Sequence, residues 1–342
     1  MKILVTGAAG YIGTHLCVAL VEAGFQPVAL DNFSNSRPAA IDRIGAIVGS
    51  PVPLRVGDVG DAAFLAEVFE EDDFGAVIHL AGLKSVEESC RRPLRYYQNN
   101  VGGALALCAA MQRGGVRKLL FSSSATVYGA AAAVPTSETA PLSAVNPYGR
   151  SKLMTERLLA DLADARSDEK GYWGVGALRY FNPVGAHPSG LIGEDPVGIP
   201  NNLVPYVADV ALGKRPYLNV WGANYDTRDG TGIRDYLHVM DLAEGHVAAL
   251  RYLLSDDRRG FHVWNLGTGR GYTVLEVVAA FERASGREIP CVLAPRRAGD
   301  IAESCADIGR ALAELGWQAQ RGLDEMMADV WRWRRANPDG IH

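Results

Sequence analysis

The sequence has no run of about 18 uninterrupted apolar residues, the length that a membrane-spanning helix requires. It also lacks the pattern of a secretory signal peptide, because a strand-like segment follows the first residue directly. The formal net charge is only −5, which provides no positive field for nucleic acid or an anionic membrane surface. We therefore expect a cytoplasmic protein that acts on a small molecule. An anionic substrate would have to meet a local group of basic side chains.

Cysteine is scarce, with five residues in 342 and no C-x-x-C pair. The number is odd, and Cys17 and Cys108 lie inside apolar, helix-like segments. This pattern disfavours a disulfide framework and indicates free thiols in a reducing compartment. We also expect no bound metal.

Apolar residues make up 48% of the chain, enough for a large core. Strand-like and helix-like segments alternate over the first half, which predicts a doubly wound α/β fold with a parallel sheet. Strands are expected at residues 2–6, 27–30, 52–56, 76–80, 118–121 and 175–180. Helices are expected at residues 11–23, 61–71, 100–113 and from 147 or 148 to 165.

The composition of the sequence changes after residue 180, where the regular alternation of strands and helices ends. Residues 182–202 are rich in proline and glycine and are expected to form loops. Further strands are expected at 217–221 and 263–266, and further helices at 241–254 and 274–284. We place a large domain at residues 1–180 and a smaller mixed α/β domain at 181–342, some of whose segments could return to the large sheet.

Three glycines, Gly7, Gly10 and Gly13, separate the first strand from the first helix. Such a turn lets the backbone approach a pyrophosphate, and the helix N-terminus offers free N–H donors. A plain tight turn is the alternative, which the strand–turn–helix context disfavours. Asp31 ends the second strand, where a carboxylate can bind a ribose hydroxyl and would repel a 2′-phosphate, so NAD is favoured over NADP. For Asp31 the alternative is a simple turn former.

Tyr148 and Lys152 lie four residues apart at the start of a predicted helix and so share one face. A free tyrosine titrates near ~10, but a nearby ammonium favours the phenolate and would make Tyr148 a usable general base. A Tyr–Lys pair at this spacing is usually a solvated helix face. Here Ser124 and Thr126 follow the fifth strand and could hold a substrate alcohol; the alternative is a serine-rich loop that satisfies its own backbone.

These glycines, Ser124, Tyr148 and Lys152 together resemble the extended short-chain dehydrogenase/reductase family, and within it the UDP-glucose 4-epimerases. The closer resemblance covers nearly the whole chain. It is carried by residues 30–32 (LDN), 81–84 (AGLK), 97–101 (YQNNV), 124–129 (SATVYG), 146–152 (NPYGRSK), 179–187 (RYFNPVGAH), 198–203 (GIPNNL) and 229–236 (DGTGIRDY).

The resemblance implies an NAD-binding Rossmann domain at 1–180 and a UDP-sugar-binding domain at 181–342. The residues that would bind NAD are Gly7, Gly10, Tyr11, Ile12, Gly13, Asp31, Asn32, Asn35, Ser36, Asp58, Val59, Leu80, Ala81, Gly82, Lys84, Asn99, Ser122 and Phe181. The residues that would bind the UDP-sugar are Asn182, Asn202, Leu203, Asn219, Trp221, Arg234, Arg297, Asp300 and Ser304. For Arg234 and Arg297, an ion pair with Asp235 or Asp300 is the structural alternative.

The implied reaction is the reversible 4-epimerisation of UDP-glucose and UDP-galactose. Tyr148 would take the proton of the 4-hydroxyl while hydride goes to tightly bound NAD and returns to the opposite face of a 4-keto sugar. Ala125 and Val127 flank Thr126, so the acidic side chains of related dehydratases are missing. A UDP-glucuronate 4-epimerase and a non-catalytic NAD-binding sensor stay open as alternatives.

Two further expectations come from the resemblance. Relatives are homodimers joined through two long helices, here near residues 100–113 and 148–165. Many bacterial relatives carry tyrosine beside the sugar's carbon 2 substituent, where this chain has Ser304. The smaller side chain would leave space for an N-acetyl group, which predicts activity on UDP-N-acetylglucosamine and UDP-N-acetylgalactosamine.

Overall fold

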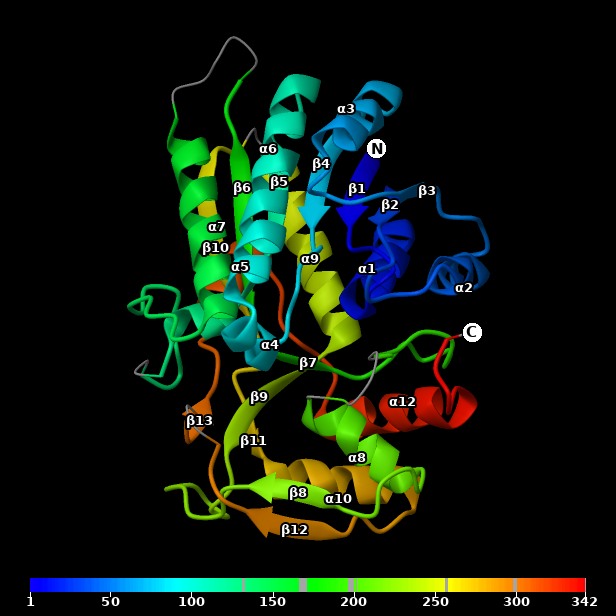
Figure 1. Ribbon diagram of the computed structural model, residues 1–342, viewed down its shortest axis with the longest axis vertical. Coiled ribbons are helices and arrows are strands. Elements are labelled where there is room, and N and C mark those ends of the chain that lie inside the picture. Colours follow the sequence, from blue (N-terminus) through cyan, green and yellow to red (C-terminus); the bar gives the residue numbers. More distant parts are fainter. Residues whose placement is uncertain are drawn as a thin grey trace.

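The computed structural model describes residues 1–130, 133–165, 171–195, 200, 202–255, 258–297 and 300–341. They form a large lobe around a seven-stranded sheet and a smaller lobe that lies beyond the carboxyl ends of its strands (Figure 1). Every strand pair in the large sheet is parallel. The predicted doubly wound α/β class is therefore confirmed.

The large sheet has the strand order β10-β6-β5-β4-β1-β2-β3. Its strands are β1 (Lys2–Thr6), β2 (Gln26–Asp31), β3 (Leu54–Val56), β4 (Phe74–His79), β5 (Lys118–Ser124), β6 (Gly174–Tyr180) and β10 (Gly260–Leu266). The chain runs outward from β1 in both directions, so the order reverses between β1 and β4. In a doubly wound sheet this reversal opens a crevice at the carboxyl ends of the strands, where ligands bind.

Helices cover both faces of this sheet, which is why its central strands are apolar without alternation. One face packs against α1 (Tyr11–Glu22), α2 (Ala39–Val48) and α9 (Val239–Leu254). The other face packs against α3 (Ala62–Glu71), α6 (Gly103–Gly114) and α7 (Pro147–Asp164). Helix α1, which follows the turn at Gly7, and helix α7, which carries Tyr148 and Lys152, therefore lie on opposite faces of one sheet.

The smaller lobe is built on a second sheet of β11 (Gly271–Thr273), β9 (Ile233–His238) and β13 (Glu303–Ser304), with β7 (Asn182–Val184) also paired to β9. A separate ribbon pairs β8 (Leu218–Trp221) with β12 (Cys291–Ala294). Three helices, α8 (Leu203–Ala211), α10 (Val274–Ser285) and α12 (Leu323–Ala336), enclose a second core around Phe281 and Met326.

Two elements of the second half return to the large lobe. Strand β10 pairs with β6 from Gly260 to Leu266, and α9 packs against α1. The division at residue 180 stays a prediction, and the large lobe contains residues from both sides of it. Short helices α4 (Val86–Arg91), α5 (Pro93–Tyr96) and α11 (Gly309–Leu315) complete the chain's connections.

Three local expectations need correction. The proline- and glycine-rich stretch is not all loop, because residues 182–184 pair with β9 as β7. The strand expected at 52–56 begins only at Leu54, after Pro51 and Pro53, which have no N–H to donate to a ladder. The helix expected at 100–113 is preceded by a π-helix, η1 (Tyr97–Gly102), that takes in its first residues.

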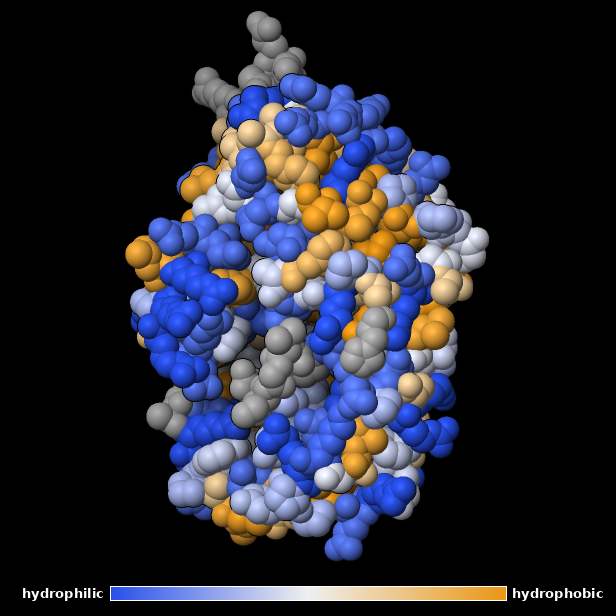
Figure 2. Space-filling view, turned by 45° about the vertical axis from the view of Figure 1, so that its right-hand side comes forward, coloured by the Kyte–Doolittle hydropathy of each residue, from blue (hydrophilic) through white to orange (hydrophobic). Residues whose placement is uncertain are grey.

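Hydrophilic residues cover most of the face seen in Figure 2, and hydrophobic residues gather on its upper half, which belongs to the large lobe. None of the helices in the ranges given above is long and apolar enough to cross a bilayer.

Candidate active site

The glycine turn after β1 is as tight as the sequence predicts. Gly7 has φ +70°, and a Cβ there would lie 2.7 Å from the backbone nitrogen of Ala81. A Cβ at Gly13 would lie 2.3 Å from the Gly7 carbonyl oxygen. The N-cap of α1 is Gly10, whose lack of a side chain leaves the first N–H groups of the helix uncapped. Close approach and free donors fit the pyrophosphate of a dinucleotide.

Asp31 closes this turn from the end of β2. Its carboxylate accepts from the Ala9 N–H (2.9 Å), the Phe33 N–H (2.9 Å) and the Ser36 hydroxyl (2.8 Å). The glycine turn and the loop after β2 are thereby joined through one buried acid. Next to it, Asn32 donates to Asp58 across 2.6 Å. The structure thus brings together the expected cofactor residues at the ends of β2 and β3, and their role toward NAD stays a prediction.

Lys152 is buried beside the end of β5. Its Nζ donates to the Ser122 carbonyl (2.6 Å) and lies 4.9 Å from the centre of the Phe121 ring. Burial lowers the pKa of this ammonium to about 8, while the charge of Glu156 acts in the opposite direction. The helix that carries it begins at Pro147, where the Asn146 side chain caps the N–H of Gly149 at 2.8 Å. This cap fixes the first turn, so Tyr148 and Lys152 share a face as predicted.

Two opposing effects act on the pKa of the Tyr148 phenol. Burial raises the pKa of its phenol above the ordinary value, and the interaction with the Ser124 hydroxyl lowers it. The sequence predicted that the Lys152 ammonium would provide the lowering influence. In the structure that ammonium is held by the Ser122 carbonyl, and Ser124 is the group that favours the phenolate.

Ser124 and Thr126 form a small hydrogen-bonded unit. The Ser124 Oγ accepts from the backbone N–H (3.2 Å) and the hydroxyl (3.0 Å) of Thr126, and it caps the short helix η2 (Ala125–Tyr128). The alternative of a self-satisfied loop is therefore partly realised. A Cβ on Gly149 would nevertheless lie 3.3 Å from the Thr126 Oγ1, so this unit also lies against the first turn of α7. The Ser124 hydroxyl interacts with the Tyr148 phenol, and the Thr126 hydroxyl lies against Gly149, the next residue.

The π-helix η1 holds a residue that the sequence analysis did not select. Asn100 accepts from the Leu83 N–H (2.8 Å) and donates to the Leu83 carbonyl (3.0 Å) and the Ser151 hydroxyl (3.0 Å). It ties the segment after β4 to α7, next to Gly82. Inserted π-turns often accompany functional sites, but the sequence has no local signal for one beyond the Asn99-Asn100 pair.

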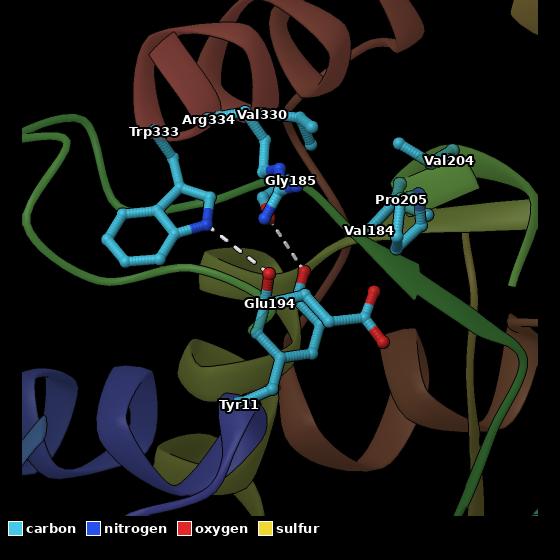
Figure 3. Close-up of a pocket in the computed structure, with 9 residues that line it drawn as sticks. All are labelled: Tyr11, Val184, Gly185, Glu194, Val204, Pro205, Val330, Trp333 and Arg334. Atoms are coloured by element: carbon cyan, nitrogen blue, oxygen red, sulfur yellow. Dashed lines mark hydrogen bonds between the residues drawn. The ribbon is translucent and has the colours of Figure 1, made fainter. Parts of the chain in front are cut away.

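A second unselected residue, Glu194, joins two residues that the resemblance gave to different ligands. Lys84 Nζ lies 3.3 Å from its Oε1, and Asn202 donates to the same oxygen across 3.0 Å. Figure 3 shows Glu194 beside Tyr11, whose hydroxyl donates to the Gly185 carbonyl across 2.7 Å. The cofactor and substrate residues thus meet at one carboxylate.

Arg234, which the resemblance assigns to the substrate, lies on β9. Arg234 donates to the backbone carbonyls of Ile233 (2.8 Å) and Ile301 (3.0 Å), and its Nη2 lies 3.6 Å from Asp300. Ser304 pairs with Arg234 where β13 meets β9. Of the two structural alternatives for Arg234, the ion pair with Asp300 is therefore present, whereas Asp235 is fully buried. It accepts instead from the N–H groups of Thr268, Gly269 and Ala306.

Arg297 stacks on Trp221 with its guanidinium 4.7 Å from the ring centre, and Asn219 lies two residues earlier on β8. Phe181 donates its N–H to the Leu266 carbonyl across 3.1 Å, where the chain leaves β6. The other predicted site residues follow the carboxyl ends of strands or begin helices, at Ile12, Asn35, Val59, Leu80, Asn182 and Leu203.

Comparison with known proteins agrees with this geometry. Residues 3–267 match the model of the NAD dependent epimerase/dehydratase family. The UDP-glucose 4-epimerase of Bacillus subtilis (strain 168) is 55% identical over 340 residues, which cover 99% of this chain and 98% of that protein.

Solved structures of the same kind align over almost every residue. A UDP-glucose-4-epimerase from Stenotrophomonas maltophila, with bound NAD and formylated UDP-arabinopyranose, aligns with a TM-score of 0.95 at 48% identity and covers 99% of both chains. One from Bifidobacterium longum, in complex with NAD+ and UDP, aligns with a TM-score of 0.93 at 48% identity over 99% of this chain and 100% of that one. This chain therefore belongs to the NAD-dependent epimerase/dehydratase family.

Proposed function

We propose that this protein interconverts UDP-glucose and UDP-galactose by oxidising and re-reducing carbon 4 of the sugar, with NAD kept bound between turnovers. The observation that carries the proposal is the placement of Tyr148 against Ser124 and one turn before the buried Lys152. This placement occurs in a chain 55% identical over its length to a UDP-glucose 4-epimerase.

The chain's own residues have distinct tasks in this reaction. When bound at the Gly7–Gly13 turn, NAD supplies the acceptor and the donor of the hydride. Tyr148 Oη takes the proton from the sugar 4-hydroxyl and later returns it. Ser124 and Thr126 hold that oxygen, because their hydroxyls lie against the first turn of α7. Lys152, with a pKa of about 8, keeps a positive charge at neutral pH behind the phenol.

The small lobe would hold the UDP group. Arginine binds phosphate through a planar fork, and Arg234 and Arg297 are the basic residues that β9 and β8 bring to this side. Binding through the diphosphate anchors the intermediate without fixing which face of the sugar meets the nicotinamide. Inversion at carbon 4 follows from this freedom.

The direct test is incubation of the purified protein with UDP-galactose and no added cofactor, followed by sugar analysis. We expect UDP-glucose to form until equilibrium is reached. Turnover of UDP-glucuronate alone would support the uronate epimerase. Retained NAD without turnover of UDP-galactose, UDP-glucose or UDP-glucuronate would support the non-catalytic NAD-binding sensor.

Ser304 extends the proposal to N-acetylated sugars. It lies opposite Arg234 in the β13–β9 pair, beside a residue that we assign to the substrate. We expect turnover of UDP-N-acetylgalactosamine beside UDP-galactose. Ser304→Tyr should lower kcat/KM for the N-acetylated substrate at least about 10-fold more than for UDP-galactose, by filling the space for the acetyl group. Equal losses for both sugars would contradict this specificity role.

We also propose a cytoplasmic homodimer joined through α6 and α7. Leu105 and Met154 are exposed on these helices, and Leu94 on the adjacent α5 is 67% exposed. Apolar side chains gathered on neighbouring helices are typical of a subunit interface. The molar mass in solution, measured by light scattering, should be twice that of the chain.

A further inference from the structure

A buried ion pair joins α7, the helix that carries Tyr148, to strand β6. Arg179 donates from Nε to Glu156 Oε1 (3.0 Å) and from Nη2 to Oε2 (2.7 Å), and both residues are 3% exposed. Burying two charges is costly, and an apolar pair of similar volume is often as stable or more so. Stability alone therefore does not explain why these two charges are buried beside the site.

The pair holds both ends of the segment that carries Ser124 and Thr126. At one end the Ser123 hydroxyl donates to Glu156. At the other end Arg179 Nη1 donates to the Tyr128 hydroxyl across 3.0 Å, and its guanidinium stacks 4.9 Å from the Tyr128 ring centre. The segment from Ser123 to Tyr128, which includes the Ser124 and Thr126 hydroxyls, is therefore anchored at both ends by one ion pair.

The same pair also faces Lys152. Glu156 lies one turn after it on α7, and its negative charge raises the pKa of the ammonium that burial lowers. The other groups against Lys152 come from different strands. The Phe121 ring and the Ser122 carbonyl come from β5, and His79, whose pKa burial lowers to about 3, comes from β4 and is neutral. Among the residues that the structure describes, Glu156 is thus the carboxylate whose charge offsets the effect of burial on Lys152.

We propose that Glu156 is a positioning residue for the reaction: paired with Arg179, it keeps the Ser123–Tyr128 segment and the Lys152 ammonium aligned with Tyr148 and touches no substrate. The inference rests on the proposed function. Glu156 is not one of the predicted site residues, yet it would align three of them, Ser124, Thr126 and Lys152.

Glu156→Gln is the first variant, because it keeps the shape of the side chain and removes its charge. We expect kcat for UDP-galactose to fall about 10- to 100-fold, the effect of small misplacements in an active site, while KM changes little. Since the opposing charge is gone, Lys152 should lose its proton at lower pH. The alkaline limb of the kcat–pH profile should therefore move to lower pH.

A double variant separates positioning from stability. Glu156→Gln leaves Arg179 as a buried unpaired charge, so loss of stability alone could lower activity. Glu156→Met combined with Arg179→Met removes both charges and should recover the melting temperature, yet kcat and the alkaline limb should stay altered. Wild-type kcat and pH profile in this double variant would show the pair to be only structural and would overturn the proposal.

A readout without turnover keeps this proposal separate from the proposed function. NMR of the NAD-bound protein labelled at lysine Cε follows the titration of Lys152, assigned by its loss in Lys152→Met. The Lys152 pKa should fall in Glu156→Gln, and an unchanged value would overturn the proposal even if UDP-galactose were not a substrate. Lack of turnover in the wild-type protein, by contrast, would refute only the proposed function.

Discussion

Replacing Tyr148 with phenylalanine should lower kcat for UDP-galactose about 10²- to 10⁴-fold, the range that a lost general acid–base group costs. The variant removes only the phenolic oxygen, so the ring still fills its place in the first turn of α7. The glycine turn and Asp31, at the ends of β1 and β2, are untouched. The purified variant should therefore contain as much NAD as the wild-type protein, measured by its absorbance after denaturation.

Tyr252→Phe is the matched control for this variant. Tyr252 lies on α9 and packs edge-on against His262 and Trp264, away from the residues assigned to the reaction. Its loss of a hydroxyl should leave kcat unchanged. If Tyr148→Phe kept more than about a tenth of the wild-type kcat, another group would have to serve as the base.

Gly7→Ala should remove most bound NAD and destabilise the fold by about 2–4 kcal/mol, from left-handed backbone strain together with overpacking. The new Cβ would lie 2.7 Å from the Ala81 nitrogen and 2.9 Å from its Cα. Both are backbone atoms at the end of β4, which cannot move without disturbing the sheet. Urea unfolding of the NAD-free protein gives the change in stability, and the NAD content of the purified variant gives the binding defect.

Gly24→Ala separates strain from contact. Gly24 has φ +86°, close to that of Gly7, but a Cβ there would meet nothing within 4 Å. Only the strain of a left-handed alanine remains, which costs about 1 kcal/mol. NAD content should match that of the wild-type protein. Equal effects of the two substitutions would contradict the close contact at Ala81.

The parts of the site that the sequence predicted are those whose residues are neighbours in the chain. The turn from Gly7 to Gly13 and the Tyr148–Lys152 pair depend on one strand–helix junction and one helix face, and both have patterns readable over a few residues. The strand–helix alternation also predicted the parallel class of the large sheet, but it did not place β10 in that sheet, because no local pattern shows which strand β10 pairs with.

The parts that it did not predict depend on pairs far apart in the chain. Glu194 meets Lys84, and Arg179 meets Glu156, only after the sheet has assembled. A carboxylate in a polar loop or a helix has no local feature that distinguishes a buried partner from a solvated one. The π-helix at Asn100 is similar, because the extra residue in the turn is stabilised by contacts with Leu83 and Ser151 from other segments.

The connections between the two lobes limit both their relative motion and the exchange of one lobe for another. The chain passes from β6 into β7, from β9 directly into α9, and from β10 into β11. The lobes are therefore joined by several separate crossings of the chain. A hinge would have to bend all of them together, which restrains any opening of the crevice. Nor could either lobe be exchanged for a foreign one at a single junction: a fragment cut after Tyr180 would leave β6 as an unpaired edge, prone to stick to other chains.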